Sequence, residues 1–193
     1  DPFFRLSKIQ GYRSRSAFKL IEMNEKFRFL NKNTSLLDLG SYPGGWSQVA
    51  RKKIKKGKIL AVDIKPMEKI DKVNFLQGDL REPFIYKKIL AFFEKKIDVV
   101  ISDMAANTTG NKNLDSYKTG ALSLKAMELA KNILHNDGVF ICKLFMGSTF
   151  AEIDKKANKH FKSVVKYKPL SSKQESKEIY LYCRKFSNSF NFA

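Results

Sequence analysis

Short apolar runs alternate along the chain with longer stretches in which apolar residues recur every three or four positions. The short runs predict strands, because strands buried on both faces of a parallel sheet read as continuous apolar segments. The longer stretches predict amphipathic helices. The predicted strands cover 35–39, 58–64, 73–79, 97–103, 139–145, 163–169 and 178–186, and the predicted helices cover 14–29, 46–57, 83–96, 116–134 and 149–161.

This regular alternation predicts an α/β fold, with a mainly parallel sheet and helices on both faces. Only the polar loop 170–177 joins the last two strands, so we expect them to form an antiparallel hairpin at one edge. The length of 193 residues suits one domain. We take 1–193 as that domain, with 8–185 as its core and 186–193 as a tail that frays.

The net charge of the chain indicates more about its binding partners than about its fold. There are 37 Lys and Arg residues against 19 Asp and Glu, which gives a formal net charge of +18. Such an excess favours a polyanionic partner, either nucleic acid or an anionic membrane surface. The alternative is that many lysines serve only to keep the surface solvated. No run of 18 apolar residues occurs, so we expect no membrane span.

The two cysteines indicate a reducing compartment. Cys142 and Cys183 both lie in apolar runs, and two are too few for a disulfide scaffold or a zinc cluster. We therefore expect buried free thiols and an intracellular protein. Because the chain begins at Asp1, no targeting segment can be assessed, and cytoplasm, nucleolus and organelle stay open.

Candidate chemistry gathers where the predicted strands end, which is where ligands bind in sheets of this kind. A glycine-rich turn with Gly40, Gly44 and Gly45 follows the first strand and leads into a helix. Pro43 and the lack of a further glycine set it apart from the G-x-G-x-x-G turn that binds dinucleotides. A bare tight turn is the plain alternative for such a loop.

Acidic residues end the next three strands. Asp63 is suited to a ribose 2′,3′-hydroxyl pair, Asp79 to an adenine amino group, and Asp103 ends the fourth strand. One such Asp is usually a turn former, but the coincidence with the glycine loop predicts a nucleoside pocket. Lys143 interrupts the apolar run VFICKLF, where it either reaches water at the rim or pairs with Asp103.

Together these segments resemble a known family. LLDLGSYPGGWSQVA, AVDIKPM, FLQGDL, DVVISDMAANTTG and GVFICKLFMG, preceded by YRSRSAFKL and followed by SSKQESKEIYLYC, are similar in order and spacing to the FtsJ/RrmJ family of S-adenosylmethionine-dependent RNA 2′-O-ribose methyltransferases. The resemblance covers roughly 8–185. It implies a Rossmann-like class I methyltransferase fold with a seven-stranded sheet, and S-adenosylmethionine as cofactor.

The resemblance also implies which residues act. It assigns a catalytic tetrad to Lys19, Asp103, Lys143 and Glu178. Lys143 is either the base that takes the proton of a ribose 2′-hydroxyl or a cation that stabilises the alkoxide. The cofactor contacts that it implies are Gly40, Gly44, Gly45, Trp46, Asp63, Asp79 and Asp103.

Two positions depart from the family pattern, and its subgroups differ in substrate. Ala106 replaces a Pro, and Tyr42 replaces an Ala in the glycine loop; neither change removes a reacting group. The sequence around Gly45 is more similar to the enzymes of large-subunit ribosomal RNA than to the transfer RNA subgroup. The alternatives are a transfer RNA methyltransferase, a non-catalytic RNA-binding homologue, and a nicotinamide-dependent oxidoreductase on a similar sheet.

Basic residues beside the tetrad are the predicted RNA contacts, namely Lys8, Arg13, Arg15, Lys173 and Lys177. The run 51–58 is a further, more distant candidate, or a plain solvated face. His135 and His160 are isolated in the sequence, so we expect no metal site. We expect a monomer.

Overall fold

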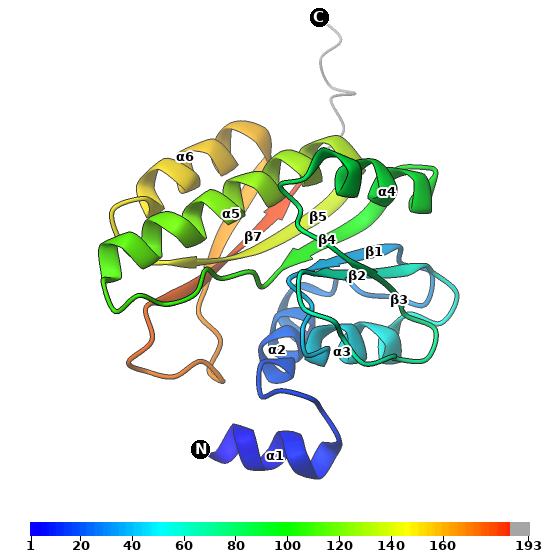
Figure 1. Ribbon diagram of the computed structural model, residues 1–193, viewed down its shortest axis with the longest axis horizontal. Coiled ribbons are helices and arrows are strands. Elements are labelled where there is room, and N and C mark those ends of the chain that lie inside the picture. The colour runs from blue at the N-terminus through cyan, green and yellow to red at the C-terminus, as the bar shows by residue number, and fades with distance from the viewer. Residues whose placement is uncertain (186–193) are drawn as a thin grey trace, which may run out of the picture.

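A single seven-stranded sheet organises the chain in the computed structural model, which describes residues 1–185 (Figure 1). The strands are β1 Leu36–Leu39, β2 Ile59–Asp63, β3 Asn74–Gln77, β4 Ile97–Ser102, β5 Leu134–Phe145, β6 Ser163–Tyr167 and β7 Glu178–Arg184. The helices are α1 Pro2–Gln10, α2 Ala17–Phe27, α3 Gly45–Lys53, α4 Pro83–Phe93, α5 Lys112–Ile133 and α6 Phe150–His160. The predicted fraying of 186–193 lies outside the described residues.

The strand order is β3-β2-β1-β4-β5-β7-β6. The first five strands pair in parallel, and β7 pairs antiparallel with both β5 and β6. The predicted seven-stranded fold with an antiparallel pair at its end is therefore confirmed. The order reverses between β1 and β4, so a crevice opens beyond their carboxyl ends, where ligands of such sheets bind.

Helices cover both faces of the sheet, as Figure 1 shows: α4, α5 and α6 on one face, α2 and α3 on the other. Each face has its own apolar core, one centred on strand residues such as Leu37 and Phe140 and the other on residues such as Leu36 and Ile141. Because β1 and β5 contribute side chains to both cores, they read as continuous apolar runs. Both cysteines are buried free thiols, as expected.

The structure differs from the predicted elements at the N-terminus. No helix was predicted before residue 14, yet α1 spans Pro2–Gln10. Asp1 caps it by accepting hydrogen bonds from the amides of Phe3 and Phe4 at 3.0 and 3.2 Å, and Gly11 ends it at φ +74°. The sequence does carry signals for this helix: an N-cap aspartate followed by a proline at its start, and a glycine just after its end.

The boundary between α5 and β5 also differs. The predicted helix ends at 134 and the predicted strand begins at 139, but α5 ends at Ile133 and the intervening Asn136, Asp137 and Gly138 lie inside β5. The structure pairs Leu134 with Ile97, and the register then shifts before Val139 pairs with Val99. The turn-forming residues are therefore accommodated as a bulge within a longer strand.

Candidate active site

A cavity of about 850 Å³ opens beyond the carboxyl ends of β1, β2, β3 and β4. Its wall includes the three predicted aspartates Asp63, Asp79 and Asp103, together with Gly40. Side chains from the start of α5, such as Tyr117, close the other side. Sequence reasoning missed this helix face: its residues lie within the predicted helix 116–134, but only the tertiary packing shows which face of the helix turns toward the cavity.

Gly40 makes the turn out of β1 possible. Its backbone has φ +74°, and a Cβ there would lie 2.6 Å from the side chain of Met104. The amides of Gly40 and Ser41 both donate to the carbonyl of Val62, at 2.9 and 3.2 Å. The first strand therefore turns tightly over the end of the second, which brings Tyr42 to the cavity wall.

Asp63 holds this turn in place while it faces the cavity. Its carboxylate accepts the amide of Tyr42 at 2.9 Å and the amide of Lys65 at 2.9 Å. A carboxylate has about four acceptor sites, so two remain for hydroxyl donors of a ligand. The structure thus fits the prediction that Asp63 accepts from a ribose diol.

Asp79 is held by its neighbour Arg81. The guanidinium donates to both carboxylate oxygens at 2.7–3.1 Å, and the Arg81 amide donates at 2.9 Å. These hydrogen bonds from Arg81 lower the pKa of Asp79 below its usual value. A charged acceptor at the end of β3 suits an amino group such as that of adenine.

Asp38 is a buried acid that sequence reasoning did not include. It lies within β1 with no exposure, and the Ser47 hydroxyl donates to one of its oxygens at 2.7 Å. Its other oxygen has no partner. Burial raises the pKa of Asp38 to about 7, although the Ser47 hydrogen bond opposes this, and the charges of Asp103 and Asp63 raise it further.

Asp103 connects the cavity to the predicted tetrad. It lines the cavity, and its Oδ1 lies 3.4 Å from Lys143 Nζ. The hydroxyl of Tyr180, the strand neighbour of Lys143, donates to the same oxygen at 2.7 Å. Burial, followed by the charges of Asp103 and Glu178, raises the pKa of Tyr180 well above its usual value. Tyr180 is a member of the site that sequence reasoning missed, since it reads as one of several core aromatics.

Lys19 and Glu178 form the second half of the tetrad. They make an ion pair whose side chains are only 12% and 9% exposed, and Ser172 Oγ donates to Glu178 at 2.8 Å. Burial acts to raise the pKa of Glu178, but the charge and hydrogen bond of Lys19, with Ser172 and Lys143, hold it below its usual value. Two cations and two carboxylates therefore meet beside the cavity.

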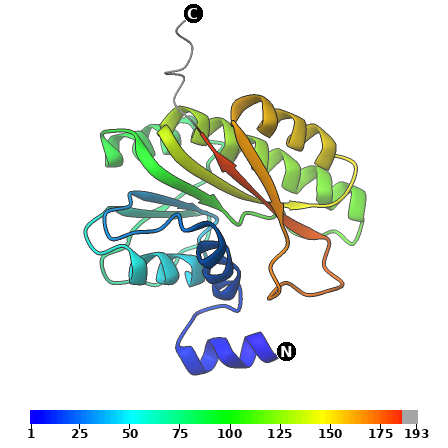
Figure 2. The same cartoon turned by 180° about the vertical axis from the view of Figure 1, so that it is seen from behind.

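The loop before β7 is fastened to α2 and to the segment preceding it. Glu22 accepts hydrogen bonds from the Ser171 amide and hydroxyl at 3.1–3.4 Å. The Arg15 guanidinium donates to the Ser171 carbonyl and also pairs with Asp1 at 3.0 Å. Figure 2 shows this loop and the N-terminal segments on the same side of the sheet. These contacts hold the loop so that Ser172, together with Glu178 at the start of β7, lies next to Lys19.

Three predicted cofactor residues do not line the cavity. Gly44 and Gly45 begin α3, where a Cβ would meet side chains of Arg13 and Ser14. Trp46 is buried, with its indole N–H donating to the Ser16 carbonyl at 2.8 Å. Gly44, Gly45 and Trp46 thus pack the glycine loop against the segment 13–16. Their contact with a cofactor stays a prediction.

The predicted RNA residues fall into two groups. Lys8, Lys173 and Lys177 are exposed. The guanidinium of Arg13 instead donates to three backbone carbonyls, two of them in 68–69, and Arg15 holds Ser171. For these two arginines the structure shows a role in holding loops, which sequence alone could not show. RNA contact by any of the five stays a prediction.

Neither a metal cluster nor a membrane helix stands out in the described region. Within residues 1–185 no group of three or more His, Cys, Asp and Glu side chains is placed to hold a metal ion. In the same residues no helix combines the length and apolarity needed to cross a bilayer. His135 pairs with Asp98 at 2.5 Å, at the edge of the sheet where the parallel strands begin.

Comparisons with known proteins agree with this geometry. The profile of the family described as FtsJ-like methyltransferase matches residues 12–186. "Ribosomal RNA large subunit methyltransferase E" of Pelagibacter ubique is 44% identical over 184 residues, covering 95% of this chain and 91% of that protein. The protein of the same name from Rickettsia akari is 43% identical, over 94% and 82%.

Solved structures give the same answer for the fold. A ribosomal RNA methyltransferase, putative, from Plasmodium falciparum has a TM-score of 0.82 and 35% identity, covering 91% of this chain and 98% of that one. A protein from Streptococcus mutans described as a putative methyltransferase, in complex with SAH, has a TM-score of 0.56 at 15% identity and shares the fold. With a family profile over nearly its whole length and relatives above 40% identity, the chain belongs to the FtsJ-like methyltransferase family.

Proposed function

We propose that this enzyme methylates a ribose 2′-oxygen in large-subunit ribosomal RNA. The observation that carries the proposal is the placement of Lys143 against Asp103, at the rim of a cavity suited to S-adenosylmethionine. This cofactor, which the family uses, supplies a methyl group already activated by the sulfonium. The protein therefore has to position the accepting oxygen and to manage its proton.

The cavity has the hydrogen-bond acceptors that a nucleoside needs. Asp63 keeps acceptor sites for two ribose hydroxyls, and Asp79 presents a carboxylate to an amino group. The volume of about 850 Å³ lies in the range of small-molecule sites. These residues would hold the cofactor, and Asp103 is the member of the wall that also contacts the tetrad.

Lys143 contacts the attacking oxygen in this account. Methyl transfer leaves the 2′-oxygen without its proton, and a lysine amine at that point either accepts the proton or stabilises the developing negative charge. Asp103, held in turn by Tyr180, fixes the direction of the amine. Lys19 and Glu178, an ion pair with little exposure, orient the substrate ribose from the other side.

The exposed basic residues on the segments beside the tetrad agree with an RNA substrate. Lys8 lies on α1, and Lys173 and Lys177 lie on the loop that carries Ser172 to the tetrad. A phosphate backbone bound there would bring a ribose to Lys143. The relatives above 40% identity carry the name of a large-subunit ribosomal RNA methyltransferase, which favours that RNA over transfer RNA.

Methyl transfer from tritiated cofactor to purified RNAs tests the proposal. Large-subunit ribosomal RNA or the large subunit itself should accept label, whereas transfer RNA should not. Labelling of transfer RNA alone would instead support the runner-up substrate. A wild-type protein that binds the cofactor but labels neither RNA would contradict the proposal and favour a non-catalytic RNA-binding homologue.

A further inference from the structure

Lysines gather at the edge of the sheet where the parallel strands begin, the end opposite to the cavity. Helices in such a sheet run antiparallel to the strands, so the ends of α3, α4 and α5 reach this edge. The amino-end arc, as we name it, consists of Lys32, Lys55, Lys56, Lys96, Lys131 and Lys185. All but Lys185, which is partly buried, are exposed.

One half of the arc joins the loops before β1 and β2. The carbonyl of Lys32 accepts the amides of Lys55 and Lys56 at 3.0 and 2.7 Å, so the three side chains leave adjacent backbone. The Lys58 amine donates to the Phe92 carbonyl at 3.3 Å, which ties this loop to the end of α4.

The other half joins the segments around β4, β5 and β7. The Lys96 amine donates to the carbonyl of Asn132, and the Lys185 amine donates to the carbonyls of Lys131 and Leu134 at 2.8 and 3.1 Å. These contacts place Lys96, Lys131 and Lys185 together, and Lys96 follows the end of α4 to which the first half is tied.

The charge of the arc is little compensated. Within residues 1–185, none of its six lysines forms an ion pair with a carboxylate. Glu94, Asp98, Glu128 and Asp137 are the carboxylates nearby in sequence, and of these Asp98 already pairs with His135 and Glu128 with Lys125. Partial burial, followed by the positive charges of Lys96 and Lys131, lowers the pKa of Lys185, as expected where cations crowd together.

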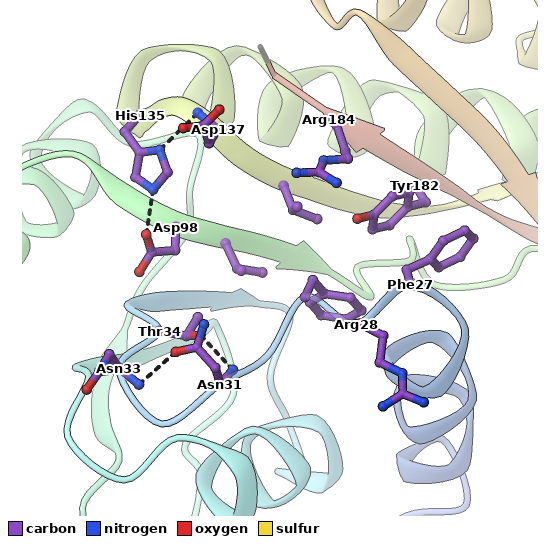
Figure 3. A pocket seen from close by; sticks show the side chains of 13 residues that line it. Phe27, Arg28, Asn31, Asn33, Thr34, Asp98, His135, Asp137, Tyr182 and Arg184 are labelled. Atoms are coloured by element: carbon purple, nitrogen blue, oxygen red, sulfur yellow. Dashed lines mark hydrogen bonds and ion pairs between the residues drawn. The ribbon is translucent and has the colours of Figure 1, made fainter. Parts of the chain in front are cut away.

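A polar hollow of about 350 Å³ opens on the same edge (Figure 3). Figure 3 shows Arg184, next to Lys185, on one side of it and Arg28 on the other. Asn31 and Asn33, which flank Lys32, lie at its lower rim. A chain of phosphates following the arc would therefore meet two guanidinium groups and side-chain amides besides the lysines, with Asp98 and Asp137 as the carboxylates of the same hollow.

Helix dipoles do not account for this distribution. Lys131 lies in the last turn of α5, where the dipole favours a cation whatever its partner. Lys32 precedes β1, and Lys185 follows β7, where no helix ends. A solvated surface also has no need to place its cations in one band.

We propose that the amino-end arc binds the sugar–phosphate backbone of the folded RNA substrate, at a second contact remote from the methylated ribose. The inference rests on the proposed function for the identity of the RNA. One RNA would then contact the enzyme at two places. The tetrad binds the target ribose, and the arc binds the backbone of a neighbouring part of the same RNA.

The test is the double variant Lys55→Gln/Lys56→Gln, with Lys87→Gln/Lys88→Gln as its control. The control removes the same charge from exposed positions within α4. Binding of a large-subunit ribosomal RNA transcript is measured between 50 and 300 mM KCl. Each lost phosphate contact should weaken binding about five- to eightfold at 0.1 M salt and reduce the slope of log K against log salt by about 0.7–0.9.

The arc variant should show these losses, with cofactor affinity and kcat at saturating RNA unchanged, while the control binds as wild type does. An unchanged slope and affinity in the arc variant would overturn the proposal, as would an equal loss in the control. Loss of binding to phosphatidylserine vesicles without loss of RNA binding would point to a membrane instead and also overturn it. Failure of the proposed function is distinguishable, because it appears as wild-type protein that transfers no methyl group to this RNA.

Discussion

Asp38 makes the stability of this enzyme fall as pH rises toward neutrality. In the unfolded chain its pKa is near 3.8, and in the folded protein burial raises the pKa to about 7. The unfolded chain therefore releases this proton at lower pH than the folded protein does. The carboxyl destabilises the fold progressively between pH 3.8 and 7, and by a constant amount above pH 7.

The magnitude follows from the size of the pKa difference. Each pKa unit corresponds to about 1.4 kcal/mol, so the full cost of ionising Asp38 in place is about 4 kcal/mol. Asp38→Asn removes the titration, and it leaves a buried amide N–H₂ without a partner at a pH-independent cost of about 1–3 kcal/mol. The variant should therefore gain on wild type by about 3 kcal/mol between pH 5 and 8.

Urea unfolding of both proteins at several pH values measures this difference, and comparing the two proteins cancels the titration of all other groups. Asp79→Asn is the control, because its lowered pKa places its pH effect below this range. A stability difference between Asp38→Asn and wild type that stays constant from pH 5 to 8 would refute the reasoning, as it would mean that Asp38 is ionised throughout.

Four further substitutions test the geometry of the site and the packing of the fold. Tyr180→Phe removes the hydroxyl that donates to Asp103 and should slow methyl transfer about tenfold, corresponding to about 1.4 kcal/mol, with an unchanged cofactor Kd in calorimetry. Lys19→Met and Glu178→Leu should each destabilise by about 3–5 kcal/mol in urea unfolding, and the double variant by far less than their sum, because a single change leaves a buried charge unpaired. Gly57→Ala should lower the Tm by several degrees in calorimetry, since a Cβ there would lie 1.8 Å from a backbone oxygen and the loop must move.

The sequence alone was sufficient to predict the sheet and the functional residues at the ends of its strands. Short apolar runs identified all seven strands, and the aspartates at or just after the ends of β2, β3 and β4 do line one cavity. The pairing of Lys143 with Asp103 was also predictable, because a charge within a buried strand needs a partner nearby.

The roles of some site residues depend on tertiary contacts and could not be predicted from the sequence. Tyr180 reads as a core aromatic, and only its position opposite Lys143 in the sheet brings its hydroxyl to Asp103. Arg13 and Arg15 read as RNA contacts, since a basic side chain in a loop looks the same whether it meets phosphate or backbone carbonyls of its own chain. Long-range partners of this kind leave no local signal in the sequence.

The most direct measurement is the mapping of methylated ribose in large-subunit ribosomal RNA after incubation with cofactor and enzyme. A ribose methylated on its 2′-oxygen resists alkaline cleavage, because that oxygen can no longer attack the adjacent phosphate. We expect one new alkali-resistant position with wild-type protein and none with Lys143→Ala, which should still bind the cofactor. A methyl group found on a base, or near-normal turnover by Lys143→Ala, would contradict it.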